Sequence, residues 1–212
     1  MIDHIQGRSG TDLAGANDPI LQTLERYWQA LRHADRIPAR NDIEPAKIDI
    51  VLPYCFIAQR VAPGTARMRV AGQKLHDLLK MDARGMPLTT FFHPQARDQI
   101  KALLESAFTE PAIMSVPLSS PGNQIRSQID GTMLLLPLRD HDGKPSRILG
   151  ALVADRKTGE GPRRFVVVEH GKIRHEQIGL KQPAFTLMPR DPVQTQRPDV
   201  ARPALRLVVN NG

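Results

Sequence analysis

The sequence predicts an α+β fold in which a five-stranded antiparallel sheet carries helices on one face and is preceded by an N-terminal amphipathic helix. Five short apolar segments have the composition of strands, and helical segments separate the first two from the last three. Turn residues stand within each group of strands, and strands joined by hairpins pair antiparallel. The helices between the second and third strands therefore cover one face of a single sheet.

The chain begins with a polar stretch, residues 1–17, which we expect to be a flexible leader. A helix is predicted over residues 19–34, because Asp18 is a good N-cap and Pro19 suits the first helical position. Its apolar stripe, spaced by three and four residues, includes Leu24, Tyr27, Trp28 and Leu31. This stripe is a candidate partner-binding face; alternatively, it packs on the domain's own core.

Residues 37–53 form a connector, in which prolines favour extended chain and short turns, with one helical turn near residues 46–51. Charged residues cluster in and just before it, namely Arg32, Arg36, Arg40 and Asp42. They are a candidate anion site, because a guanidinium group can donate two parallel hydrogen bonds to a carboxylate or phosphate. Alternatively, they clamp the connector by pairing among themselves or with backbone carbonyls.

Strands are predicted at residues 54–60 and 66–71, and Pro63-Gly64 between them is a hairpin signal. Leu75, Leu78 and Leu79 then have helical spacing. A short helix is expected within residues 86–92.

A longer helix begins near Pro94, because apolar residues from Ala96 to Phe108 fall on one face. Three strands follow, at residues 112–118, 130–139 and 147–155, and an Asp-Gly turn joins the last two. The order of elements is thus two strands, several helices and three strands.

Three segments of the sequence are distinctive: Leu24-x-x-Tyr27-Trp28-x-x-Leu31-Arg32, Arg36-x-Pro38-x-Arg40-x-Asp42-x-x-Pro45 and later landmarks such as Leu136-Pro137-Leu138. In these segments the sequence resembles one bacterial PAS family of small, mostly uncharacterised proteins. The resemblance covers about residues 18–155. It implies a five-stranded antiparallel sheet, an inner cavity between sheet and helices, and a role in signalling or partner binding, but no reaction. We therefore expect a domain over residues 18–156 and an extension over residues 157–212.

The cavity that the resemblance implies would be lined by strand residues that we expect to face inward, namely Phe56, Ile57, Met68, Val70, Leu134 and Leu136. They are apolar and suit the holding of a ligand or simple packing. No cofactor can be named. His76 is a weak candidate for a haem ligand, and Cys55 reads as a buried hydrophobe in a strand and not as a flavin-reactive thiol.

No set of residues indicates an enzyme or a metal site. His93 begins the long helix, and His141 with Asp142 lies in a turn, so they have no reason to converge on one pocket. Ser119 and Ser120 precede Pro121-Gly122, a pair of residues typical of a turn, so neither serine stands in a nucleophile elbow.

The net charge of +7 is concentrated in the extension. Residues 157–212 hold ten Lys or Arg against five Asp or Glu, together with six prolines, which indicates a basic, proline-rich arm. No aromatic residues alternate with these basic residues to stack bases, so nucleic acid is an unlikely partner. The sequence shows neither a membrane span nor a signal peptide, and its single cysteine suits a reducing compartment, so we expect a cytoplasmic protein.

We therefore expect a stand-alone PAS-type sensory or regulatory module that acts through protein contacts, either as a homodimer or with another protein. A small-molecule ligand is possible. Two alternatives belong to other classes: a small α+β enzyme or ligand carrier with a cone-shaped cavity, and a nucleic-acid binder that uses the basic tail.

Overall fold

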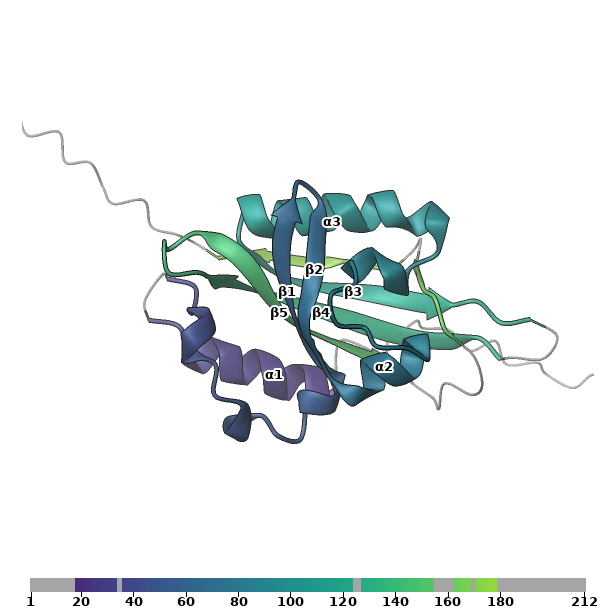
Figure 1. Ribbon diagram of the computed structural model, residues 1–212, viewed down its shortest axis with the longest axis horizontal. Coiled ribbons are helices and arrows are strands. Elements are labelled where there is room, and N and C mark those ends of the chain that lie inside the picture. Colours follow the sequence, from purple (N-terminus) through teal and green to yellow (C-terminus); the bar gives the residue numbers. More distant parts are fainter. Residues whose placement is uncertain (1–17, 34–35, 124–126, 155–161, 169–170, 179–212) are drawn as a thin grey trace, which may run out of the picture. The chain divides into compact units, whose positions relative to one another are not determined.

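The computed structural model describes residues 18–33, 36–123, 127–154, 162–168 and 171–178, and it has an antiparallel sheet at its centre (Figure 1). Hydrogen bonds connect the strands in the order β2-β1-β5-β4-β3-β6, and β7 also pairs with β3. The strands span Cys55–Ala62 (β1), Thr65–Ala71 (β2), Ala112–Ser120 (β3), Ile129–Arg139 (β4), Pro145–Ala154 (β5), Val166–Val167 (β6) and Arg174–Gln177 (β7).

The five expected strands are confirmed as β1 to β5, and their hairpins form where the turn residues indicated. Gly64 and Gly143 have positive φ angles of 63° and 78°, which glycine adopts without strain. The sheet continues beyond residue 156, because β6 and β7 extend it along the outer edge of β3. Residues 1–17 and 179–212, which contain the expected leader and most of the basic arm, lie outside the described residues.

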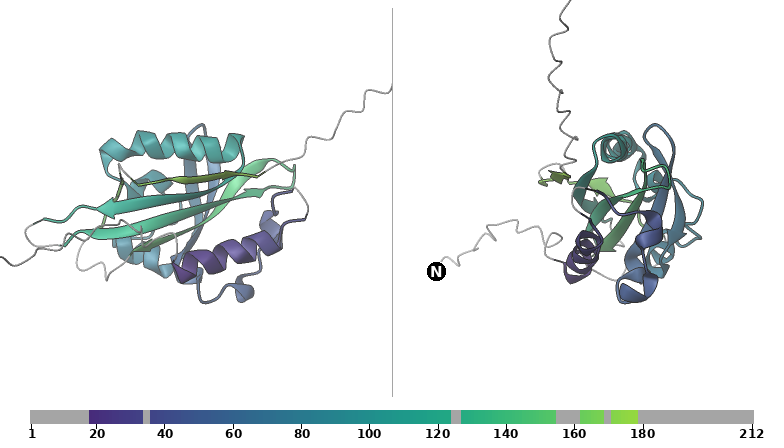
Figure 2. Two further views of the ribbon diagram at one scale, coloured as in Figure 1. Left: turned by 180° about the vertical axis from the view of Figure 1, so that it is seen from behind. Right: turned by 90° about the vertical axis from the view of Figure 1, so that its left-hand side faces the viewer.

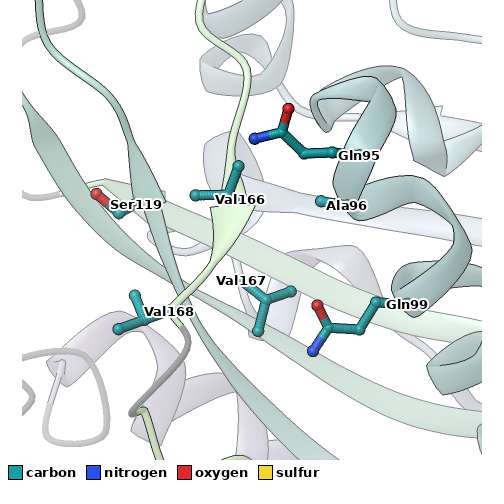
Figure 3. A pocket seen from close by; sticks show the side chains of 7 residues that line it. All are labelled: Gln95, Ala96, Gln99, Ser119, Val166, Val167 and Val168. Carbon is teal, nitrogen blue, oxygen red and sulfur yellow. The ribbon is translucent and has the colours of Figure 1, made fainter.

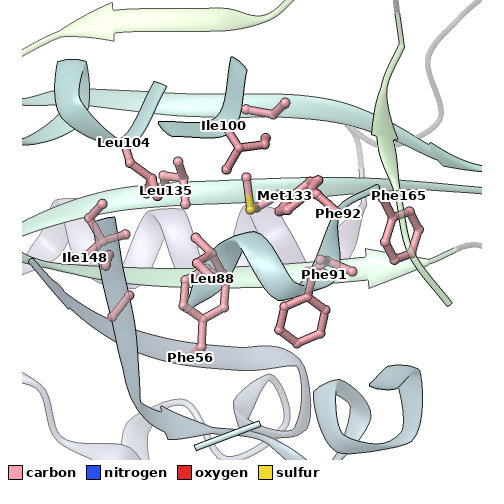
Figure 4. Close-up of a cluster of buried hydrophobic side chains, with 14 of the residues drawn as sticks. Phe56, Leu88, Phe91, Phe92, Ile100, Leu104, Met133, Leu135, Ile148 and Phe165 are labelled. Carbon is pink, nitrogen blue, oxygen red and sulfur yellow. The ribbon is translucent and has the colours of Figure 1, made fainter. Parts of the chain in front are cut away.

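One face of the sheet, here called the inner face, is covered by the helices that follow β2. These are α2 (Gln73–Leu79), the short turns η4 (Leu88–Phe91) and η5 (Pro94–Ala96), and α3 (Arg97–Thr109). Large side chains fill the space between them and the sheet, among them the fully buried Phe56, Leu88, Phe91, Phe92 and Met133 (Figure 4). This inner core is where the resemblance places a cavity.

The opposite face, here called the outer face, is covered by α1 (Pro19–Ala30), so the sheet lies between α1 and α3 (Figures 1 and 2). Asp18 caps α1 as expected, since its Oδ1 accepts a hydrogen bond from the backbone N–H of Ile20 at 2.8 Å. Leu24 and Trp28 are fully buried against the sheet, and the Trp28 indole N–H donates to the carbonyl oxygen of Pro137 at 3.0 Å.

Helix α1 is shorter than predicted, because it ends at Ala30 and not near residue 34. The N–H of Arg32 bonds to the carbonyl of Gln29, a tighter turn that ends the helix. Among the residues that the structure describes, no helix is long and apolar enough to cross a membrane.

The connector packs beside α1 on the outer face as a series of single turns, η1 (Arg40–Asp42), η2 (Pro45–Lys47) and η3 (Leu52–Tyr54). The single helical turn expected near residues 46–51 is thus replaced by three separate turns, of which η2 begins at Pro45 and η3 has Pro53 at its second position. Arg139 holds the first part of the connector, because its N–H donates to Pro38 and its Nε–H to Ile37. The apolar side chains Ile43, Ile48 and Val51 are buried against the sheet.

Candidate functional site

A pocket of about 350 Å³ lies on the outer face between the connector and the sheet. This connector-side pocket forms because side chains alternate along a strand, so that Cys55 and Ile57 of β1 point toward the connector. Val70 of β2 and Leu149 of β5, the two neighbours of Ile57 across the sheet, complete the floor.

The roof of the pocket comes from the three turns of the connector, whose lining residues are Arg40, Ile43, Pro45, Ile48 and Leu52. Gly72 joins roof and floor. A Cβ atom there would lie 2.2 Å from the carbonyl oxygen of Leu52 and 2.4 Å from that of Pro53. The φ angle of Gly72 is −74°, so the glycine is needed for this close backbone contact and not for its conformation.

Two residues of the lining, Cys55 and Arg40, have side chains with a polar or charged functional group. The Cys55 thiol donates to the carbonyl of Val51 at 3.1 Å, and burial raises its pKa to about 12, so it stays a neutral thiol at physiological pH. Arg40 is half-buried, and its guanidinium group has no hydrogen-bond or ion-pair partner among the described residues. The pocket therefore combines apolar walls with one unpaired cation, and it holds no acid–base pair.

A family model described as a PAS domain matches residues 17–153, which is most of the described chain. This chain belongs to the PAS domain family. The match spans the first four strands predicted from sequence and the fifth as far as residue 153, and it confirms the resemblance found there.

Solved structures similar to this PAS protein include light-oxygen-voltage (LOV) domains. A LOV protein of Rhodobacter sphaeroides is 14% identical, with a TM-score of 0.39, over 50% of this chain and 61% of that chain. The dark structure of the blue-light photoreceptor Aureochrome1 LOV is 19% identical, with a TM-score of 0.39, over 57% of this chain and 90% of that one. An RNA-binding light-oxygen-voltage receptor is 15% identical, with a TM-score of 0.38, over 51% and 32%. None of the curated proteins matches this chain.

The six residues expected to line a PAS cavity do not lie in one pocket. Phe56 and Met68 are in the inner core, although Phe56 also borders the connector-side pocket, whereas Ile57, Leu134 and Leu136 face the outer side beneath α1 and the connector. Val70 is 46% exposed and lines the connector-side pocket with Ile57. The set is divided between the two faces because neighbours along a strand, such as Phe56 and Ile57, have side chains that point to opposite sides of the sheet. An irregularity in the β1–β2 register also separates Met68 from Val70.

The predicted partner face of this PAS domain, formed by Leu24, Tyr27, Trp28 and Leu31, packs on the domain itself. Leu24 and Trp28 are inaccessible to a partner. Tyr27 is half-buried, and its hydroxyl accepts a hydrogen bond from the N–H of Glu44 at 2.7 Å, which ties α1 to the connector. Leu31 is half-buried as well. The alternative given from sequence, packing on the domain's own core, is the one observed.

The four charged residues proposed as an anion site or clamp do not meet in one place. Asp42 accepts a hydrogen bond from the Ala39 N–H at 2.7 Å, and within the described chain no ion pair joins it to Arg32, Arg36 or Arg40. Arg32 donates to Gln29 and lies over the Trp28 ring, with its Cζ atom 5.6 Å from the ring centroid. Arg36 is exposed. Of the four, Arg40 is the one that lines the connector-side pocket.

His76 is engaged by the backbone through both ring nitrogens. The N–H of Ala83 donates to Nδ1 at 3.0 Å, so the proton is on Nε2, which lies 3.1 Å from the carbonyl oxygen of Ala71. This arrangement joins the end of β2 to the loop after α2. It leaves neither nitrogen free to bind iron.

A second pocket, also of about 350 Å³, lies between the start of α3 and β6 (Figure 3). Its polar groups are the amides of Gln95 and Gln99 and the hydroxyl of Ser119, and its remaining walls are Ala96 and three valines. None of these side chains titrates, so the pocket offers hydrogen bonds but no acid or base. Ser120, the other serine considered from sequence, is buried.

The remaining candidates from sequence are dispersed over the surface. His141 and Asp142 form an exposed pair, with Nε2 and Oδ1 3.1 Å apart, next to Asp140 in the β4–β5 turn. Such exposed groups are common without an ion. His93 is half-buried and precedes η5. The described residues thus bring none of the three histidines considered from sequence into the connector-side pocket.

Sequence reasoning missed the connector as the wall of a pocket. Ile43, Ile48 and Leu52 recur every four or five residues between the prolines, and this apolar recurrence in a segment expected to be loop was a usable signal. It indicates a segment that packs on the sheet.

Proposed function

We propose that this protein is a regulatory PAS module that senses a small apolar ligand in the connector-side pocket and reports it through contacts with a protein partner. The observation that carries the proposal is the pocket itself. Its volume of about 350 Å³ falls within the range of small-molecule sites, and its walls are almost wholly apolar. The space on the inner face is filled by side chains from the protein.

The connector is suited to respond to a ligand because its backbone hydrogen bonds run mostly within its own turns, and among the described residues few join it to the sheet. It has three single turns, and Arg139 anchors only its first part to the sheet. Segments with little regular hydrogen bonding open at low free-energy cost. A ligand between roof and floor therefore changes the position or the stability of the connector.

Helix α1 is placed to carry that change to the surface. The hydroxyl of Tyr27 on α1 accepts the N–H of Glu44 in the connector, and Leu24 and Trp28 share one outer core with Ile43 and Ile48. Movement of the connector thus alters the docking of α1. We propose that a partner, either another protein or a second copy of this chain, binds with an affinity that depends on how α1 packs on the sheet.

Thermal unfolding with octan-1-ol as the probe tests the sensing step. A compound that binds only the folded state raises its stability, by about 2.7 kcal/mol at a concentration one hundred times the dissociation constant. We expect a rise in Tm for the native sequence and no rise for Val70→Trp, whose indole fills the mouth of the pocket. Val61→Trp is the matched control, since Val61 is also 46% exposed but lies outside the pocket. Equal responses of the two variants contradict the proposal.

The single tryptophan, Trp28, tests the reporting step. We expect octan-1-ol to change the acrylamide quenching of Trp28 fluorescence in the native sequence, and Tyr27→Phe to reduce the change because the hydrogen bond to Glu44 is lost. Quenching that stays constant at saturating probe would show that the pocket and α1 are not coupled.

The structure gives less support to the other two functions considered from sequence. An enzyme needs an acid and a base that converge, and the connector-side pocket offers one guanidinium group and one neutral thiol. Nucleic-acid binding depends on the basic arm, most of which lies outside the described residues, and it stays a prediction.

A further inference from the structure

We propose that the ligand of the connector-side pocket is a small apolar carboxylate, held by its alkyl or aryl body between connector and sheet and by its carboxylate on Arg40. The inference rests on the proposed function, because it names the ligand class of the same pocket. It depends on the size of the pocket, the state of Arg40 and the charges around it.

The size of the pocket limits the ligand. One water molecule takes about 30 Å³ in the liquid, so a volume of about 350 Å³ holds on the order of ten non-hydrogen atoms. The walls that surround this space are the side chains of Ile43, Ile48, Ile57 and Leu149. A short alkyl chain or a single aromatic ring fits between them, whereas a long lipid or a nucleotide exceeds the space.

Among the described residues, Arg40 is the one charged residue of the lining. The turn η1 places it at the pocket, where its side chain is half-buried and lacks a partner among the described residues. No nitrogen atom of Arg40 is buried without a partner, so its guanidinium group can meet a ligand at the water-accessible side of the pocket. A ligand carboxylate satisfies it, because the two oxygens of a carboxylate match the planar fork of arginine.

The carboxylates of the connector do not compete for Arg40, because each has another partner. Asp42 accepts the Ala39 N–H at 2.7 Å, Glu44 pairs with Lys47 at 2.9 Å, and Asp49 accepts the Ile50 N–H at 2.7 Å. Among the described residues, none of these carboxylates forms an ion pair with Arg40, so its guanidinium group is available to a ligand.

The strands beside the pocket carry further positive charge. Arg147 pairs with Gln59 across the sheet, two residues along β5 from Leu149, and its Nε atom is buried without a partner. Residues two apart on a strand share a face, so Arg147 lies on the pocket side of the sheet. Arg69 donates to the Gln59 side chain at 2.8 Å. This surplus of cations favours an anionic ligand and disfavours a cationic one.

Isothermal titration of the full chain with octanoate, octan-1-ol and octylammonium tests the inference, since the three share one alkyl chain and differ in charge. A hydrogen bond to a charged group is strong enough that we expect octanoate to bind at least tenfold more tightly than octan-1-ol. Octylammonium should bind most weakly. In Arg40→Gln the preference for octanoate should fall to less than threefold, with the affinity for octan-1-ol unchanged, which shows that the variant is folded.

Arg26→Gln is the matched control, because it removes the same charge from an exposed residue of α1 outside the pocket. It should keep the tenfold preference. Equal binding of octanoate and octan-1-ol by the native sequence overturns the inference and leaves the proposed function in place. A preference that survives in Arg40→Gln overturns it too. If none of the three probes binds, the inference and the proposed function both fail.

Discussion

Gly72 is the residue on which the shape of the connector-side pocket depends most directly. Its lack of a Cβ lets the end of β2 touch the backbone of Leu52 and Pro53, and this contact closes one end of the pocket. The contact joins two segments that are about twenty residues apart in sequence. A glycine before a helix can have several roles, so the sequence alone did not identify this one.

Gly72→Ala should destabilise the protein and weaken binding of octan-1-ol. The added Cβ meets main-chain atoms at 2.2 to 2.5 Å, which cannot move aside without shifting the connector. Overpacking of this kind costs typically about 1–3 kcal/mol. Urea unfolding gives the loss of stability, and titration with octan-1-ol gives the change in affinity. An unfolding free energy equal to that of the native sequence would show that the connector does not rest on Gly72.

Cys55 should make stability depend on pH in the alkaline range. Burial raises the pKa of its thiol from 9.0 to about 12, so above pH 9 the unfolded chain loses a proton that the folded chain keeps. Stability due to this group is complete below pH 9 and declines as pH rises toward 12. Between pH 8 and pH 10 the native sequence should lose about 1 kcal/mol more than Cys55→Ala. Urea unfolding at both pH values measures this, and identical losses would mean that the thiol titrates normally.

At the scale of elements, local signals in the sequence were sufficient for most of the fold. Asp18 and Pro19 began α1, Pro63-Gly64 formed the β1–β2 hairpin, and the apolar face of α3 became buried as expected. β7 and the connector-side pocket were missed, and both depend on distant partners. β6 and β7 are two and four residues long and exist only because β3 offers a free edge. The connector-side pocket likewise forms only when the connector packs on the folded sheet, which provides its floor.

Phe165, just before β6, tests whether the segment beyond residue 156 is part of the domain. Its side chain is fully buried in the inner core, its N–H donates to Phe91 at 2.8 Å, and its carbonyl accepts from His93 at 2.9 Å. Phe165→Ala should lower the unfolding free energy by about 3–5 kcal/mol. Val166→Ala, at a half-buried neighbour, should cost clearly less. If both substitutions were nearly neutral in urea unfolding, the segment would not contribute to the core.

At the scale of the whole molecule, one sheet supports two different faces. The inner face is filled by aromatic and aliphatic side chains between the strands and α3, whereas the outer face leaves a space beneath the connector. The sequence predicted a PAS domain and the family match confirmed it. The residues that the sequence assigned to one cavity lie on both faces, because the sequence does not show how the connector packs against the sheet.

Methyl NMR of the full chain titrated with octanoate measures most directly which face holds the ligand. We expect shifts in the methyl signals of Ile43, Ile48, Ile57, Val70 and Leu149 around the connector-side pocket, with the inner-core methyl signals of Ile100, Leu104, Leu135 and Ile148 unchanged. Shifts confined to the inner group, or no shifts at all, would contradict a sensing site beneath the connector.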